Sequence, residues 1–252
     1  MKKLLFISSL VIVSVLVAGF YLWTKSYGAP PYDDSQSTDQ TFDMLIDPYA
    51  NWTRPEGPIR IGLQAGHWKT SEMPEEQERI KENGGGTSGL GVAEWEVNLK
   101  VAELTAETLR AQGYVVDILP ATVPEDYWAD AFISIHADGN LNPTVNGYKV
   151  AANARDRTGD AASLSAIVEK NYGQIVGLRL DPNITVNMTR YYAFNARRYV
   201  HAVHPMTPAI LVELGFMTNP TEARMLINNP QLPAKALAVG VTEFISSLGL
   251  DK

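Results

Sequence analysis

Two histidines and one glutamate stand where short apolar runs of the sequence end. His67 follows residues 59–65, His136 follows residues 131–135, and Glu213 closes residues 209–213. Short runs rich in aliphatic and β-branched residues predict buried strands of a parallel sheet. The carboxyl ends of such strands meet at one edge, where α/β proteins place their binding and catalytic groups. We therefore expect the three side chains to gather at one edge of one sheet.

Such a cluster has the composition of a metal site. A single histidine at a strand end is more often a hydrogen-bonded structural residue, but a glutamate inside an apolar run is costly to bury without a partner. Two neutral imidazoles and one carboxylate bind a divalent metal and leave a position open for water, which is the pattern of catalytic zinc. From the residues alone, His67, His136 and Glu213 are candidate Zn2+ ligands.

Composition narrows the class of protein. The chain has 252 residues, of which 45% are hydrophobic and 19% charged, as expected for a globular domain of ordinary α/β size. Cysteine is absent, which excludes disulfides, thiolate metal sites and cysteine nucleophiles, so any metal must be held by His, Asp or Glu. The net charge of −7 and the absence of a basic stretch predict no binding to nucleic acid.

The amino terminus predicts export. Lys2 and Lys3 precede an apolar run over residues 4–23, roughly the twenty residues that a helix needs to cross a bilayer. The run ends in aromatic residues typical of a membrane interface, and Tyr27 stands where a signal-peptide cleavage site needs a small residue. We expect an uncleaved anchor in the cytoplasmic membrane, and the alternative is a secreted protein whose residues 1–29 are removed.

We divide the chain into three parts. Residues 1–24 are the transmembrane anchor or signal segment, residues 25–57 are a polar extracytoplasmic linker, and residues 58–252 are the catalytic domain. The two lysines of the amino terminus should stay in the cytoplasm, which places the domain outside the cell.

The domain is predicted to be a single α/β domain with a mostly parallel twisted sheet flanked by helices. Helical spacing over residues 94–112 lies between strands at residues 59–65 and 114–119, a unit that implies parallel strands and a right-handed crossover. We expect an exposed charged segment at residues 72–83 and then a glycine-rich loop at residues 84–91, which lacks the lysine of a P-loop. We also expect an edge strand at residues 147–152 and three further helices at residues 161–178, 219–227 and 232–248.

Four segments, in this order and spacing, carry a resemblance to a known family. They are residues 64–67 (QAGH), 89–99 (GLGVAEWEVNL), 134–138 (SIHAD) and 208–220 (PAILVELGFMTNP). The chain from about residue 59 to 248 resembles the zinc-dependent N-acetylmuramoyl-L-alanine amidases of bacterial cell-wall turnover, the amidase-3 family.

The resemblance implies both an activity and a set of site residues. The implied activity is zinc-dependent hydrolysis of peptidoglycan at the amide bond between N-acetylmuramic acid and the L-alanine of the stem peptide. By resemblance, His67, Glu94 and His136 bind Zn2+, and Glu213 is the catalytic carboxylate rather than a ligand. The glutamate of the family stands four residues before an asparagine, which selects Glu94 over Glu96. The implied partner is peptidoglycan, while the cytoplasmic membrane is expected as a partner from the N-terminal apolar run alone. Whether an activator protein is needed is not indicated.

The chain departs from the family pattern on one side of the expected metal site. The glycines that usually follow the first histidine are replaced by Trp68 and Lys69, and the charged segment over residues 72–83 is an insertion beside the metal. The shape of this rim, and with it the contacts to substrate, should therefore differ.

Several alternatives stay open. His201 and His204 form an H-x-x-H pair that could bind metal, although Pro205 and Pro208 favour a loop there. Ser134 is expected to point away from His136, which disfavours serine-hydrolase chemistry. The alternative functions are a zinc peptidase that cuts within the stem peptide and a non-catalytic cell-wall-binding module. The presence of all four implied site residues argues against the last.

Overall fold

The computed structural model of the chain describes residues 47–250. Residues 47–53 contain a turn and belong to a unit, Met1–Thr53, that is separate from the unit Arg54–Lys252. The expected anchor at residues 1–24 and most of the expected linker lie outside the described residues. Among the residues that are described, no helix combines the length and apolar character needed to span a bilayer.

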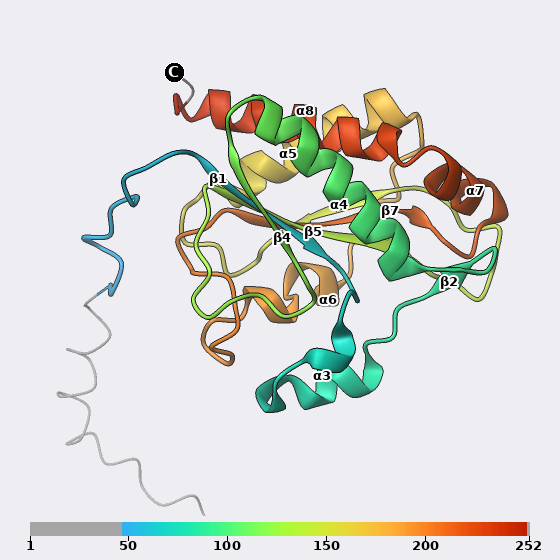
Figure 1. Ribbon diagram of the computed structural model, residues 1–252, viewed down its shortest axis with the longest axis horizontal. Helices are drawn as coiled ribbons and strands as arrows, with labels where there is room; N and C mark the ends of the chain where they lie inside the picture. The colour runs from blue at the N-terminus through green and yellow to red at the C-terminus, as the bar shows by residue number, and fades with distance from the viewer. Residues whose placement is uncertain (1–46, 251–252) are drawn as a thin grey trace, which may run out of the picture. The chain divides into compact units, whose positions relative to one another are not determined.

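A five-stranded sheet forms the centre of the unit Arg54–Lys252 (Figure 1). Four strands are parallel, and the edge strand β6 runs antiparallel to β7. The prediction of a single α/β domain with a mostly parallel sheet is therefore confirmed. In spatial order the strands are β4 (Val115–Leu119), β1 (Arg60–Ala65), β5 (Ala131–Asp138), β7 (Ala209–Phe216) and β6 (Lys149–Ala152).

Three long helices cover one face of the sheet. They are α4 (Glu94–Ala111), α5 (Ala161–Val176) and α8 (Gln231–Ser247), which pack on one another and cross the same face in Figure 1. The shorter helix α7 (Pro220–Asn228) follows β7. The main hydrophobic core lies between these helices and the sheet, with fully buried residues such as Leu63, Ile133, Leu164 and Phe244. Each helix buries one apolar stripe, so the spacing of its apolar residues predicted the helix from the sequence.

Mostly irregular chain covers the opposite face. It includes the loop after β4, the short helix α6 (Val186–Thr189) and the 3₁₀ helix η4 (Tyr192–Phe194). A second, smaller core forms here, in which the rings of Phe132 and Phe194 meet edge to face with centroids 6.3 Å apart. This face carries the alternate side chains of the strands, among them His136 and Glu213.

The insertion after β1 is more ordered and less exposed than expected. It forms the 3₁₀ helices η2 (Thr70–Glu72) and η3 (Glu75–Gln77) and then α3 (Glu78–Asn83). Met73 and Gln77 are buried, so the segment is anchored rather than a freely solvated surface helix. The glycine-rich stretch over residues 84–91 was expected to be a loop, but near its end β2 (Ser88–Gly89) pairs with β3 (Val92–Ala93) in a small hairpin.

Candidate metal centre

His67 is held by the turn that ends β1. Its backbone has a φ of 64°, in the left-handed region that a residue with a side chain rarely adopts. The Thr70 hydroxyl donates to the His67 carbonyl at 2.8 Å, and His67 Nδ1 lies 2.5 Å from the Gly84 carbonyl. The carbonyl needs a donor, so Nδ1 carries the proton and Nε2 has a free lone pair.

Glu94 is the first residue of α4 and is buried beside His67. Its Oε2 accepts a hydrogen bond from the Thr87 backbone N–H at 2.9 Å. Its Oε1 accepts from Asn98 Nδ2 and from the Ala137 backbone N–H, both at 3.1 Å. These donors, together with the positive end of the helix dipole, hold the carboxylate in its charged form.

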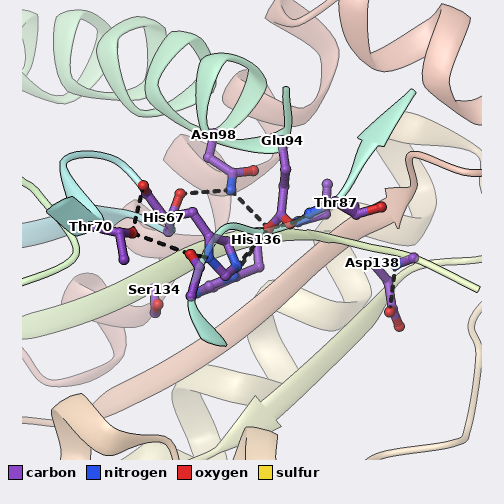
Figure 2. Close-up of polar contacts among 12 residues, drawn as sticks. His67, Thr70, Thr87, Glu94, Asn98, Ser134, His136 and Asp138 are labelled. Atoms are coloured by element: carbon purple, nitrogen blue, oxygen red, sulfur yellow. Dashed lines mark hydrogen bonds and ion pairs between the residues drawn. The ribbon is translucent and has the colours of Figure 1, made fainter. Parts of the chain in front are cut away.

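His136 completes the cluster from β5. Its Nδ1 lies 3.2 Å from Glu94 Oε1, and its Nε2 lies 3.0 Å from the Tyr191 hydroxyl. His67 Nε2 lies 3.5 Å from the same carboxylate oxygen. One ligand atom from each of the three residues lies within 4.8 Å of the others, and Figure 2 shows the side chains converging. Among the described residues, this is the group that could hold a metal ion.

Two glycines make the convergence possible. A Cβ on Gly66 would clash with the imidazole of His136. A Cβ on Gly86 would lie 2.9 Å from both Glu94 Oε2 and His67 Cγ, and the φ of Gly86 is 69°. Larger residues at either position would push the ligand side chains apart.

The donor set fits a divalent metal. Burial alone would raise the pKa of Glu94, but hydrogen bonding from His136 and the charges of the two imidazoles lower it to about 2. Burial lowers the pKa of His67, which favours its neutral form. In contrast, the hydrogen bond to Glu94 and the charges of Glu213 and Glu94 outweigh burial and raise the pKa of His136. His67 Nδ1 contacts the Gly84 carbonyl and His136 Nε2 contacts the Tyr191 hydroxyl. The other nitrogen of each ring faces the Glu94 carboxylate. This outer layer of hydrogen bonds is what metal-binding histidines normally have.

Glu213 lies beside the cluster without joining it. It pairs in register with His136 across the parallel strands β5 and β7, so both side chains stand on the same face of the sheet. Its Oε2 is buried and has no hydrogen-bond partner within the described chain. Burial, followed by the nearby charges of Glu94 and Asp138, raises the pKa of Glu213 to about 8, against the opposing effect of His136. A carboxyl group with such a pKa can exchange a proton near neutral pH.

An open cavity of about 490 Å³ exposes these groups to ligands. His67, Glu94, His136 and Glu213 all line it, together with Asp138 and polar residues of the neighbouring loops. We call it the metal-side cavity. Behind it, Lys149 of β6 stands in register with Glu213 and forms ion pairs with Asp138 and, at 3.4 Å, with Asp181.

Asn98, Tyr191 and Lys149 contribute to the site but were not selected as site residues from the sequence. Asn98 stands one helical turn after Glu94, a spacing that places both on one helix face and could have indicated the contact. Tyr191 lies in an irregular segment whose path no sequence pattern indicated.

The alternatives weighed from the sequence lie elsewhere or have other partners. His201 Nδ1 lies 2.8 Å from Glu76 Oε1, and His204 Nδ1 accepts a hydrogen bond from the Met206 backbone N–H at 3.1 Å. Glu96 is exposed and caps the start of α4 by accepting from the Ala93 N–H at 3.0 Å.

The expected orientation of Ser134 was wrong. Ser134 and His136 are two residues apart on one strand, so they share a face, and Figure 2 shows Ser134 near His136. The Ser134 hydroxyl is nevertheless buried and donates to Gln64 Oε1 at 2.6 Å. A serine nucleophile therefore remains disfavoured, for a different reason.

Comparison with known proteins places this chain in a family. A profile of the N-acetylmuramoyl-L-alanine amidases, amidase-3 type, matches residues 61–245. The amidase AmiC of Neisseria meningitidis is 26% identical over 218 residues, which cover 68% of this chain and 52% of AmiC. The amidase LytC of Bacillus subtilis is 27% identical over 154 residues, which cover 56% of this chain and 28% of LytC. The chain thus spans about half or less of the length of these relatives.

A solved structure shares the fold. The CwlD amidase of Clostridioides difficile, determined in complex with the GerS lipoprotein, superimposes with a TM-score of 0.54 at 16% identity. The match covers 75% of this chain and 99% of CwlD. The two proteins therefore share the architecture described above.

Proposed function

Because the chain belongs to the amidase-3 family of N-acetylmuramoyl-L-alanine amidases, we propose that it is a zinc-dependent peptidoglycan hydrolase. The bond that it cleaves is the amide between N-acetylmuramic acid and the L-alanine of the stem peptide. The observation that carries the proposal is the convergence of His67, Glu94 and His136 next to a buried, unpartnered oxygen of Glu213. Buried polar atoms of purely structural residues normally have a hydrogen-bond partner, so the unpartnered Glu213 oxygen favours a catalytic role.

His67, Glu94 and His136 would hold the Zn2+ ion. The atoms His67 Nε2, His136 Nδ1 and Glu94 Oε1 face the same place, and they stay there because the other polar atoms of these side chains have fixed partners. When bound, Zn2+ supplies Lewis acidity, which polarises an amide carbonyl and activates water near neutral pH.

Glu213 moves the proton. As a carboxylate it accepts a proton from the attacking water, and as a carboxylic acid it donates that proton to the leaving amine nitrogen of L-alanine. Burial favours the protonated form and the imidazole of His136 favours the charged form. The residue is therefore balanced for both steps.

The location of the enzyme is part of the same proposal. Amidases of this family act on the cell wall, so we propose an extracytoplasmic domain at residues 58–252, a linker at residues 25–57 and a membrane anchor at residues 1–24. We propose no protein activator for this chain. The complex with the GerS lipoprotein is known for CwlD.

Mass spectrometry of digested peptidoglycan tests the activity. The full-length chain is incubated with purified sacculi as prepared, with a chelator, and with chelator followed by added zinc. We expect free stem peptides beginning with L-alanine in the first sample, none in the second, and recovery in the third. Shortened peptides still attached to sugar would instead identify a zinc peptidase. Intact muropeptides in all three samples would contradict the proposal.

A further inference from the structure

Three arginines gather beyond the end of β6. Arg155 follows β6, Arg190 is the C-cap of α6, and Arg197 follows η4. The backbone N–H of Ala154 donates to the Thr189 carbonyl at 2.8 Å, so the segments that carry the first two arginines adjoin each other. We call the three residues the arginine cluster.

The Arg155 guanidinium is partly buried and has no compensating charge. Its Nη1 atom is buried and lacks a hydrogen-bond partner within the described chain. Burial, followed by the positive charges of Arg190 and Arg197, lowers the pKa of Arg155. A buried donor without an acceptor is costly to the folded state, and the two like charges add to that cost. An anion bound among the three arginines would relieve both penalties.

Nearby acidic residues do not neutralise the arginine cluster. Asp156 is the next residue after Arg155, but it accepts hydrogen bonds from the Thr158 hydroxyl at 2.7 Å and from the Gly159 N–H at 2.9 Å. Residues 182–212 contain no Asp or Glu, although the whole chain has a net charge of −7. The cluster is therefore a local surplus of positive charge on an acidic protein.

The arginine cluster is distinct from the metal centre. β6 runs antiparallel to β7, and beyond its end the Asn153 N–H donates to the carbonyl of Ala209, the first residue of β7. Arg155 therefore lies near the edge of the sheet where β7 begins, whereas His67 and His136 lie toward the carboxyl ends of β1 and β5. None of the three arginines lines the metal-side cavity.

We propose that the arginine cluster binds a phosphate group. Three guanidinium groups can surround a tetrahedral anion and donate to several of its oxygens, whereas a carboxylate has two oxygens that a single arginine can satisfy. Anionic lipid headgroups and dissolved phosphate both present this group, and the experiments below distinguish the two sources. The inference goes beyond the proposed function and does not depend on amide hydrolysis.

Hydrogen exchange measures phosphate binding without turnover. The full-length chain, reconstituted in phosphatidylcholine liposomes, is titrated with inorganic phosphate and, separately, with sodium chloride at equal ionic strength. Phosphate should slow amide exchange over residues 153–157 and 189–198 in a saturable way, by about tenfold at ten times its Kd. Chloride should not. An equal effect of both salts would reveal general charge screening and would overturn the proposal.

Three variants locate the binding residues. Arg155→Gln and Arg197→Gln should each raise the Kd for phosphate about tenfold, the loss expected for one hydrogen bond to a charged group. The matched control Arg224→Gln removes an exposed arginine of α7, outside the cluster, and should keep the wild-type Kd. Because its neighbours repel Arg155, Arg155→Gln should not lower the unfolding temperature. Wild-type affinity in both folded cluster variants would overturn the proposal.

Liposome composition then identifies the source of the phosphate group. Without dissolved phosphate, the chain is compared in phosphatidylglycerol liposomes and in phosphatidylcholine liposomes, whose phosphate is balanced by the choline cation. Protection of the same residues in phosphatidylglycerol alone, lost in Arg155→Gln, assigns the site to lipid headgroups. Protection by inorganic phosphate but not by phosphatidylglycerol assigns it to dissolved phosphate. Protection by neither overturns the proposal and leaves the proposed amidase activity untouched.

Discussion

The two faces of the central sheet are covered by different kinds of structure. On one face, α4, α5 and α8 bury aliphatic and aromatic side chains in a large core that is continuous across the strands. On the other, loops and short helices form a smaller core and bring the Tyr191 hydroxyl to His136. The stability of the helical face comes from buried apolar area, while the geometry of the site on the other face depends on individual hydrogen bonds. Substitutions on the two faces should therefore separate stability from function.

Glu213→Gln should have the largest effect on the functional side. The amide keeps the shape of the side chain but cannot accept and return a proton, so turnover should fall by about 10³-fold. Zinc content, measured by elemental analysis of the purified variant, should stay at the wild-type level because Glu213 is not among the three converging residues. A variant that keeps its activity would remove Glu213 from the proton transfer.

Leu237→Ala should have the opposite profile. Leu237 is fully buried in the main core on α8, so truncation leaves a cavity and should lower the free energy of unfolding by about 3 kcal/mol. Urea denaturation measures this loss. The kcat and zinc content of the folded variant should match those of the wild type. A large fall in kcat would show that the helical face is coupled to the site.

A pair of tyrosines sharpens the comparison. Tyr191→Phe removes the hydroxyl that contacts His136 Nε2 and should weaken zinc binding about tenfold in a competition titration, since outer partners orient metal ligands. Tyr172→Phe, on α5, removes a buried hydroxyl that donates to the Leu214 carbonyl at 2.7 Å. That variant should lose about 1 kcal/mol of stability and keep the wild-type zinc affinity. The same loss of zinc affinity in both would contradict the distinction.

Glu76→Gln should have the smallest effect, and a pH-dependent one. Although burial opposes it, hydrogen bonds from His201 and Val200 lower the pKa of Glu76 below its ordinary value of 4.5. The charged form therefore stabilises the insertion fully above that pH, and the contribution is lost as the pH falls through the lowered pKa. At pH 7 the variant should exchange amide hydrogens over residues 70–83 about twofold faster, a surface-pair effect. Wild type and variant should converge in acid.

The same comparison explains what the sequence predicted well. Apolar spacing indicated α4, α5 and α8 within a few residues of their observed bounds, because each helix needs one continuous stripe to cover the sheet. The strands before His67 and His136 were predicted equally well, and the parallel pairing of β1 with β5 brings the two histidines together. Glu94 was selected only through the family resemblance, because a glutamate at a helix start also serves as an ordinary cap.

The irregular face was predicted less well for a physical reason. The path of residues 186–204 is set by isolated contacts, such as the hydrogen bond from the Tyr192 hydroxyl to the Ala121 carbonyl at 2.5 Å, and not by a repeating pattern. The insertion appeared exposed because most of its residues are charged, yet the uncharged Gln77 at its centre is fully buried. Pairings between residues more than a hundred positions apart leave no local signal in a single sequence.

Anomalous diffraction at the zinc absorption edge, from crystals of the zinc-loaded chain, is the most direct test of the proposed metal centre. We expect one strong peak within coordination distance of His67 Nε2, Glu94 Oε1 and His136 Nδ1, with Glu213 beside it but not bound. A peak at His201 and His204, or none at the three converging residues of a fully loaded sample, would contradict the proposed metal centre.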